Sequence, residues 1–381
     1  MTHFLDDILR QPEELQRAFD YLCGAGQDTL QTSAAAVTKA RHVYVTGIGS
    51  SWHAALSVAP IFYHAASPVH MVDAGELLQF ATLPPAAVVI VISRSGRSAE
   101  VVNLLAKARE SAAVVIGISN SPDGALAQEA QIAMVVPTKP DHAISVNTYS
   151  TLAAAAGALA SATVTSFGEK LAASLVASVV ETESRIADWR TQIADSAWFA
   201  CDKATYFLGR GGALGSCHEA RLLWEEGAKS PATALGTSSF RHGPQEMVTP
   251  DVRFGLWIDA HRMRGQDLSV ARDLRRLGAS VMLIGQEIPD LAGDLVFQIP
   301  SIAADWQFLV DIIPAQLAAE HLARLQGVDC DVFRSCSYVV DGEFGLMNEE
   351  VAVRTEKIES LDVNGVQVFA KTKKDAAGGL H

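Results

Sequence analysis

Short apolar runs alternate with longer amphipathic segments along most of this chain. The clearest run, Val88–Ile92, consists of five β-branched residues without a polar interruption. Such a run is typical of a strand that is buried on both faces of a parallel sheet, and it is too short for a core helix. Similar runs at Val43–Thr46, Pro68–Val72 and Val114–Ile118 predict further strands. Helical spacing fills the gaps, so the pattern predicts βαβ units.

Three segments with helical spacing lie outside this alternation. The chain opens with a helical pattern over Phe4–Phe19, and a second helix precedes Arg41. Leu152–Ala160 reads as a buried helix because it is almost entirely apolar. Lys170–Ile193 has the pattern of a long amphipathic helix, which we expect to link two halves of the protein.

The pattern then repeats. Thr205–Gly215 resembles the Val43–Ser51 segment, with Gly209 opposite Gly47 at an offset of 162 residues (47 to 209). Strand-like runs follow again, at Arg253–Ile258 and Ser280–Ile284. A period of this length indicates a duplicated α/β domain. We expect N-terminal helices at 1–35, a first domain with its linker helix at 36–190, a second domain at 197–340 and a tail at 341–381.

The turn after Val88–Ile92 has the composition of an anion site. Ser93–Ser98 contains three serines, two arginines and a glycine, and it leads into a helical segment at Ala99–Arg109. Hydroxyls, backbone N–H groups and the helix dipole all favour negative charge there. The alternative is an ordinary strand-to-helix turn with Ser98 as N-cap. The matching turn of the second half, Asp259–Arg262, lacks serines, so we expect one phosphate site per chain.

The overall charge restricts the class of ligand. A net charge of −13 argues against general binding of nucleic acid or of acidic membranes, so basic residues near a turn suit a small anion. The five cysteines have no metal-ligand spacing, and we expect neither a metal nor an organic cofactor. The acidic opening is unlike a signal peptide, and the apolar run at 152–162 is too short to span a bilayer. We therefore expect a soluble, cytoplasmic protein with reduced thiols.

Four motifs in combination resemble a known family. They are Gly47–Ser51, Ser93–Ser98, Glu219–Glu226 and Phe240–Pro244. Together they are similar to the double SIS (sugar isomerase) domain family, and the resemblance covers roughly residues 35–340. It implies an α/β protein with two tandem SIS domains, each a parallel sheet flanked by helices in a flavodoxin-like three-layer sandwich.

The resemblance also implies which residues bind the substrate. In that family the serine-rich turn binds the sugar phosphate, the first-strand turn lines the sugar, and a later loop contacts its hydroxyls. These positions correspond here to Ser93, Arg94, Ser95 and Ser98 for phosphate, to Gly49, Ser50 and Ser51 for the sugar, and to Ser145 and Asn147 in the loop.

Aldose–ketose chemistry needs a base that moves a proton between C1 and C2 and a group that opens the ring. A partly desolvated carboxylate suits the first task, and a histidine titrates near neutral pH. The resemblance places these roles on Glu226 and His242. Two alternatives stay open for Glu226: a solvated helix face beside Glu225, or Glu219 as the acid that matters. His242 is otherwise a structural loop histidine.

The favoured function is an enzyme that isomerises, deaminates or deglycates an (amino)hexose 6-phosphate through an enediol or enaminol. The family's aminotransferases have two lysines where this chain has Leu223 and Tyr338, which disfavours sugar amination. The alternatives are a glucosamine-6-phosphate synthase-like aminotransferase without the glutaminase domain and a non-catalytic sugar-phosphate sensor. A dinucleotide-binding protein is disfavoured because the glycine fingerprint lacks its third glycine.

Assembly is also implied by the resemblance. In the family the His-Gly-Pro loop reaches across a two-fold axis into the neighbour's site, so we expect a homodimer with His242 donated in trans. Phe240, after the turn-rich stretch 230–240, suits an interface anchor. In the tail, the Asn-Gly dipeptide within Leu361–Val368 favours a hairpin, with a disordered end as the alternative.

Overall fold

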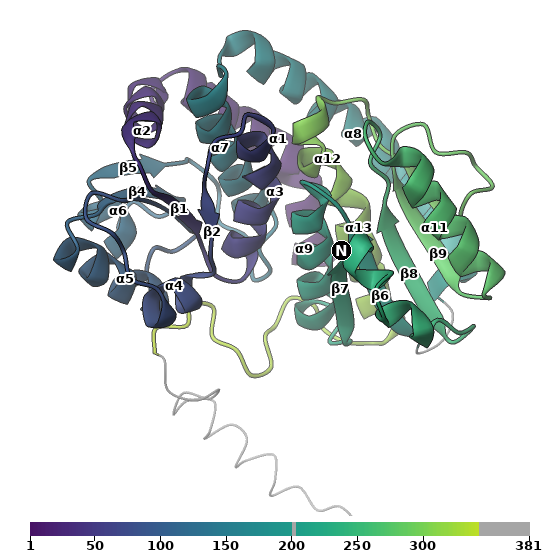
Figure 1. The fold of residues 1–381 in the computed structure, drawn as a ribbon. Helices are drawn as coiled ribbons and strands as arrows, with labels where there is room; N and C mark the ends of the chain where they lie inside the picture. Colours follow the sequence, from purple (N-terminus) through teal and green to yellow (C-terminus); the bar gives the residue numbers. More distant parts are fainter. Residues whose placement is uncertain (200–202, 343–381) are drawn as a thin grey trace, which may run out of the picture. The chain divides into compact units, whose positions relative to one another are not determined.

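The computed structural model describes residues 1–199 and 203–342, which contain two five-stranded sheets (Figure 1). Every pair of neighbouring strands is parallel. The first sheet consists of β1 (Val43–Thr46), β2 (His70–Met71), β3 (Val88–Ser93), β4 (Val114–Ser119) and β5 (Ile132–Val135). The second consists of β6 (Ala204–Gly209), β7 (Ala232–Gly236), β8 (Val252–Trp257), β9 (Ser280–Gly285) and β10 (Leu295–Gln298). Both sheets belong to one compact unit, from which residues 334–337 are separate.

The two sheets have the same topology. The spatial orders are β2-β1-β3-β4-β5 and β10-β9-β8-β6-β7, and both read 2-1-3-4-5 when the strands of each sheet are numbered along the chain. This is the flavodoxin-like order, which confirms the predicted fold class. In such sheets the chain leaves the first and third strands in opposite directions, and ligands bind in the crevice that opens there. The crevices lie at the carboxyl ends of β1 and β3 and of β6 and β8.

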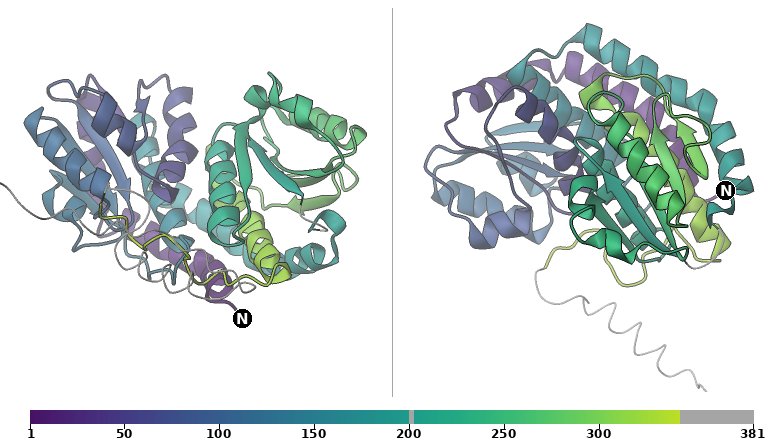
Figure 2. Two further views of the ribbon diagram at one scale, coloured as in Figure 1. Left: turned by 90° about the horizontal axis from the view of Figure 1, so that it is seen from below. Right: turned by 45° about the vertical axis from the view of Figure 1, so that its right-hand side comes forward.

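Helices cover both faces of the first sheet (Figure 2). Val89 and Val91 of β3 pack with the helices of one face, whereas Ile90 and Ile92 pack with those of the other. All six residues of β3 are buried, which confirms that its uninterrupted apolar run marks a strand covered on both faces of the sheet. The helices of this domain are α3 (Ser50–His64), α4 (Ala74–Phe80), α5 (Ala99–Glu110), α6 (Ala125–Glu129) and α7 (Asn147–Val164).

The second domain shares its main core with the first. Buried side chains of α3 and α7 belong to the same apolar cluster as those of α9 (Ala213–Glu226), and α3 packs directly on α9. The linker helix α8 (Glu169–Asp195) confirms the expected amphipathic helix and contributes to this cluster as well. The remaining elements are η1 (Ala197–Phe199), α9 (Ala213–Glu226), α10 (Thr237–Phe240), η2 (Pro244–Met247), α11 (Arg264–Arg276), η3 (Ala304–Trp306), α12 (Phe308–Asp311) and α13 (Ile313–Leu325).

The N-terminal helices are α1 (His3–Cys23) and α2 (Gln27–Lys39), and the second extends past the expected boundary at residue 35. Pro12 lies inside α1, where its missing N–H would leave the Ile8 carbonyl without a donor. The side-chain amide of Gln11 donates to that carbonyl at 3.3 Å. This bond compensates for the proline, so the helix continues across it.

The structure corrects two expectations about the second domain. The stretch 230–240 is not merely turn-rich, because it contains the strand β7 and the short helix α10. Phe240 is buried rather than exposed for an interface, and its ring packs edge-on against Phe254, with centroids 5.4 Å apart. Its expected role as an interface anchor is therefore wrong.

The hairpin expected at Leu361–Val368 lies outside the described residues. In the part of the chain that is described, no helix has the length and apolar character needed to cross a membrane.

Candidate active site

The turn after β1 forms one side of the first crevice. Gly49 has φ +56°, a left-handed conformation that strains other residues, although a Cβ there would meet nothing within 4 Å. The conformation, not crowding, is therefore what favours glycine. The turn positions Ser50 and Ser51 at the start of α3, directly at the carboxyl end of β1. These three predicted sugar-lining residues thus lie where the topology opens the sheet.

The serine-rich turn after β3 forms the other side. The Ser93 hydroxyl oxygen accepts a hydrogen bond from the Gly96 N–H at 3.1 Å, and that of Ser95 accepts from the Arg97 N–H at 3.2 Å. Each hydroxyl keeps its own hydrogen for an anion. Ser98 is the N-cap residue of α5, as the alternative expected, but its side chain makes no capping hydrogen bond. The start of the helix therefore does not use the Ser98 hydroxyl.

Arg94 connects this turn with two other segments of the chain. Its guanidinium donates to the Ser145 hydroxyl at 2.9 Å and to the Tyr338 carbonyl at 2.6 Å. The same guanidinium lies over the Tyr338 ring, 3.9 Å from its centroid. The N–H of Ala99, at the start of α5, donates to the Val340 carbonyl at 3.0 Å. The segment that begins at Tyr338 therefore lies against the serine-rich turn. Arg94 of this turn bonds to both Tyr338 and Ser145, so the three segments meet there.

Glu226 is the last residue of α9. Burial raises the pKa of its carboxyl and the nearby Glu219 raises it further, whereas Arg94 and Lys229 lower it, and the outcome is a pKa of about 7. A carboxyl with this pKa is partly ionised at neutral pH, so it can both take and return a proton. The influence of Arg94 also means that the serine-rich turn and the end of α9 share one electrostatic environment.

Glu219 lies on α9 two turns before Glu226, and seven residues bring two side chains to the same face of a helix. Glu219 is fully buried. Its carboxylate accepts a hydrogen bond from the Ser50 hydroxyl at 3.0 Å and lies 2.7 Å from Nδ1 of His53. The His53 ring stacks on His218, with centroids 5.7 Å apart. This group joins the sugar-lining turn of the first domain to the acidic face of α9.

The structure locates Asn147 away from the substrate residues. Its side chain is fully buried, and its amide donates to the Asp7 carbonyl at 3.0 Å and to the Asp141 carboxylate at 2.8 Å. The same carboxylate accepts the backbone N–H groups of Val146, Asn147 and Thr148, so it caps the start of α7. In this arrangement Asn147 anchors the loop that carries Ser145, and it has no exposed surface with which to contact a sugar.

His242 is also apart from the other predicted residues. It is exposed in the turn between α10 and η2, and its backbone N–H donates to the Ser239 carbonyl at 3.1 Å. Its ring forms no hydrogen bond or ion pair with any residue that the structure describes. Within one chain, His242 is therefore available to a partner molecule.

Sequence reasoning missed His53, and it named Tyr338 only as the residue in place of a lysine. A signal for His53 was present: it follows Ser50 by three residues, which is one turn of a helix, so both side chains lie on one face. No signal in the sequence indicated that this face meets Glu219, 166 residues away.

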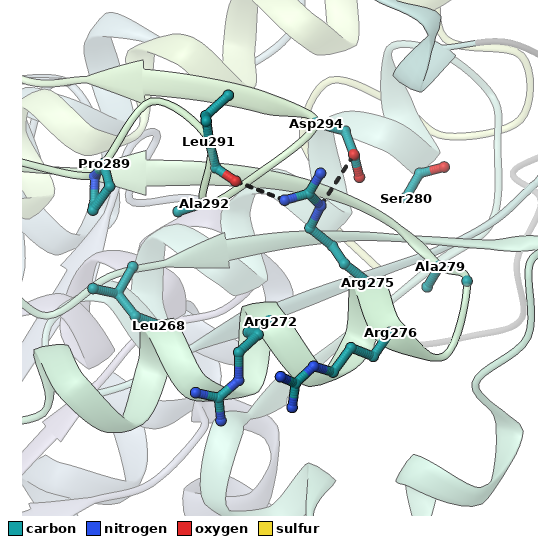
Figure 3. A pocket seen from close by; sticks show the side chains of 11 residues that line it. Leu268, Arg272, Arg275, Arg276, Ala279, Ser280, Pro289, Leu291, Ala292 and Asp294 are labelled. Carbon is teal, nitrogen blue, oxygen red and sulfur yellow. Dashed lines mark hydrogen bonds and ion pairs between the residues drawn. The ribbon is translucent and has the colours of Figure 1, made fainter.

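Two pockets lie outside this group of residues. The crevice of the second sheet contains one of about 250 Å³ that includes Arg210 and Arg262. Acidic partners hold both arginines: Asp267 lies 2.6 Å from Arg210, and Asp305 lies 3.5 Å from Arg262. Figure 3 shows a pocket of about 720 Å³ beside α11, where Arg275 is bonded to Asp294 and to the Leu291 carbonyl. Neither pocket contains a predicted site residue.

The first crevice offers side chains whose chemistry suits an anion and others whose chemistry suits proton transfer. Free hydroxyls and a guanidinium suit a phosphate, and a carboxyl with a pKa near neutrality suits the removal of a proton from carbon. Among residues 1–199 and 203–342, no three His, Cys, Asp or Glu side chains are grouped so as to hold a metal ion.

Known proteins resemble this chain in sequence. Residues 36–162 match the SIS domain family. The glutamine–fructose-6-phosphate aminotransferase (isomerizing) of Pyrobaculum aerophilum is 24% identical over 355 residues, which correspond to 90% of this chain and 58% of that protein. The chain therefore spans less than two thirds of the length of this relative.

Solved structures share the fold. The tagatose-6-phosphate ketose/aldose isomerase of Escherichia coli matches with a TM-score of 0.76 at 21% identity, over 87% of this chain and 94% of that one. The glucosamine-6-phosphate deaminase of Thermotoga maritima matches with a TM-score of 0.74 at 21% identity, over 89% and 99%. Residues 36–162 are thus similar to the SIS domain family, and the chain, with its two sheets of the same topology, shares its paired-domain fold with the solved tagatose-6-phosphate ketose/aldose isomerase.

Proposed function

We propose that this protein is an enzyme that acts on a hexose 6-phosphate, in particular one with nitrogen at C1 or C2. The reaction would be an isomerisation, a deamination or a deglycation through an enediol or enaminol. The observation that carries the proposal is the hydrogen bond between Ser50 and Glu219, which joins the turns of the first crevice to the acidic face of α9. Relatives named as a ketose/aldose isomerase and a deaminase of hexose phosphates support this class of reaction.

In this proposal the phosphate binds at the serine-rich turn through Ser93, Arg94, Ser95 and Ser98. Gly49, Ser50, Ser51 and Ser145 line the sugar. Asn147 supports the Ser145 loop from behind, since its amide is bonded to Asp141 and to the Asp7 carbonyl.

Glu226 is the proposed base. Its carboxylate takes the proton from the carbon next to the carbonyl or imine, and the electron pair of the broken C–H bond forms the C=C bond of the enediol or enaminol. Return of the same proton to the neighbouring carbon completes an isomerisation. A pKa of about 7 suits both directions, because the carboxylate and the carboxylic acid coexist at neutral pH.

The protein is proposed to work as a homodimer in which His242 of one subunit enters the site of the other and assists ring opening. The exposure of His242 and its ring's lack of a partner among the described residues of its own chain support this arrangement. Tyr338, which lies against Arg94, stands where aminotransferases of the family have a lysine, so synthesis of an amino sugar is the less favoured alternative.

A panel of substrates tests the function. Hexose 6-phosphates, amino-sugar 6-phosphates and fructosyl-amino-acid 6-phosphates are incubated with the protein, and isomerised sugar, ammonia and free amine are measured in parallel. Glu226→Gln should reduce turnover on the order of 10²–10⁴-fold, as expected for loss of a general base. Glu225→Gln is the matched control. The Glu225 carboxylate is next to Glu226 in the sequence, but it pairs with Arg221 at 2.7 Å and has no proposed role. Tight binding of a sugar phosphate without turnover in any assay would contradict the enzyme and identify the sensor alternative.

A further inference from the structure

His53 has no role in the function proposed above, yet it contacts the same carboxylate, that of Glu219, as the proposed sugar-lining residue Ser50. It lies on the first turn of α3, almost fully buried, with Nδ1 2.7 Å from the Glu219 carboxylate. Glu219 also accepts the hydrogen bond from Ser50. One buried carboxylate therefore holds both a proposed sugar ligand and an imidazole.

The pairing determines which nitrogen of His53 is free. A carboxylate at Nδ1 favours a proton on that nitrogen and fixes the orientation of the ring, which leaves Nε2 to exchange protons. Nε2 of His53 forms no hydrogen bond with any residue that the structure describes. Carboxylate–imidazole pairs with this geometry are a recurring acid–base unit in enzymes.

The surroundings of the pair are compatible with this role. His218 faces the His53 ring from α9, and burial lowers the pKa of His218 to about 4, so that neighbour is uncharged at neutral pH. Glu219 is the carboxylate that faces His53, and Glu226 lies further along the same helix face. From α7, the Tyr149 hydroxyl is near Glu219, and burial raises the pKa of that phenol, so it too is uncharged. Among these neighbours, Glu219 is the one that bonds directly to His53.

We propose that Glu219 and His53 form an acid–base pair within the same chain, in which Nε2 of His53 exchanges a proton with a sugar oxygen while Glu226 exchanges one with carbon. This inference rests on the proposed function. As Glu226 takes the C–H proton, the electron pair of the C=O π bond moves to oxygen, which takes the proton of Nε2. In the second half of an isomerisation, the neighbouring hydroxyl returns its proton to Nε2 as Glu226 returns its proton to carbon, so both groups are regenerated.

This division of work has a physical reason. Removal of a proton from carbon places negative charge on the carbonyl oxygen, and a hydrogen-bond donor aimed at that oxygen stabilises the transition state. A carboxylate that takes the carbon proton cannot neutralise the oxygen at the same moment. Pairing a glutamate base with a histidine that serves the oxygen is an established solution for aldose–ketose isomerisation.

The test is His53→Gln, assayed on whichever sugar phosphate the wild type turns over. Glutamine can still donate a hydrogen bond to Glu219, but it cannot exchange a proton at neutral pH. We expect kcat to fall on the order of 10²-fold with the sugar KM changed less than about threefold. The control is His64→Gln, because His64 lies on the same helix and also pairs through Nδ1 with a carboxylate, that of Asp305 at 2.9 Å, outside the site. The control should keep normal kcat.

Glu219→Gln is the second variant; it keeps the size of the buried side chain but replaces one acceptor oxygen with an NH2 donor. Without the carboxylate, Nδ1 of His53 loses the acceptor that fixes the tautomer and orientation of the ring, so kcat should fall at least about tenfold while the sugar KM changes little. If the pair is merely structural, both variants unfold at lower urea concentrations but keep the kcat of the wild type, and this result would overturn the proposal. Absence of turnover by the wild type on the whole panel would overturn the proposed function and this role with it, whereas a fully active His53→Gln overturns only the role of His53.

Discussion

Replacement of Glu226 by glutamine should stabilise the protein at alkaline pH. Burial, reinforced by Glu219, raises the pKa of this carboxyl from its ordinary 4.5 to about 7 in the folded protein. The folded state therefore holds a proton that the unfolded chain releases between these two pH values. Glutamine resembles the protonated form in shape and carries no charge, so Glu226→Gln removes the cost of ionising the group in its buried position.

The sign and size of the effect follow from linkage. Because the folded state binds more protons than the unfolded state between pH 4.5 and about 7, the stability of the wild type falls as pH rises through this window. The two pKa values differ by about 2.5, and one pKa unit corresponds to about 1.4 kcal/mol. Most of that difference lies between pH 5 and pH 8. Relative to the glutamine variant, the wild type should thus lose about 2–3 kcal/mol of unfolding free energy over this interval.

Urea unfolding at pH 5 and pH 8 measures this difference for the wild type, Glu226→Gln and Glu225→Gln. The advantage of Glu226→Gln over the wild type should be small at pH 5 and larger by about 2–3 kcal/mol at pH 8. Glu225→Gln controls for the loss of a carboxylate at the neighbouring position, where Glu225 is paired with Arg221 at 2.7 Å. An equal difference between Glu226→Gln and wild type at the two pH values would refute the reasoning, since it would mean that Glu226 has an ordinary pKa in the folded protein.

Three further predictions concern binding, assembly and packing. Ser98→Ala should weaken hexose 6-phosphate binding about tenfold or more in calorimetry, as expected for a lost hydrogen bond to a charged group. The control Ser111→Ala, at the opposite end of α5, should not weaken binding, and equal affinities of the two variants would locate the phosphate elsewhere. Mixed Glu226→Gln and His242→Ala subunits should recover part of the activity if His242 acts in trans, and complete inactivity of the mixture would place both residues in one chain's site. Phe240→Ala should lower the free energy of unfolding in urea by about 3–5 kcal/mol, because Phe240 is a core residue, and should leave the oligomeric state unchanged in light scattering. A change of oligomeric state without a loss of stability would contradict the placement of Phe240 in the core.

The central strands were predictable because their burial leaves a simple local pattern. β3, β4, β8 and β9 are covered on both faces, so their sequences are nearly continuous apolar runs. The strands that the sequence did not reveal, β5, β7 and β10, all lie at sheet edges. These strands are only four or five residues long and are partly buried, so their apolar runs are too short to distinguish a strand from other structure.

The same division applies to the candidate site. The serine-rich turn, the left-handed Gly49 and the duplicated organisation are local features, which a sequence expresses through turn chemistry and repeated spacing. The family resemblance directed attention to Glu226, but its raised pKa depends on burial and on Glu219 and Arg94, which come together only after folding.

The sequence by itself therefore determined the two α/β domains, the position of the proposed anion-binding turn and the residue types proposed for proton transfer. Only the tertiary structure decided that His53 and Ser50 share the Glu219 carboxylate, that Asn147 faces Asp141, and that Phe240 belongs to the core. The physical reason is that the first set depends on hydrogen bonding and hydrophobic spacing over a few residues. The second depends on which helix faces meet when α3 and α9 bury their apolar side chains in one core, and no short stretch of sequence contains that information.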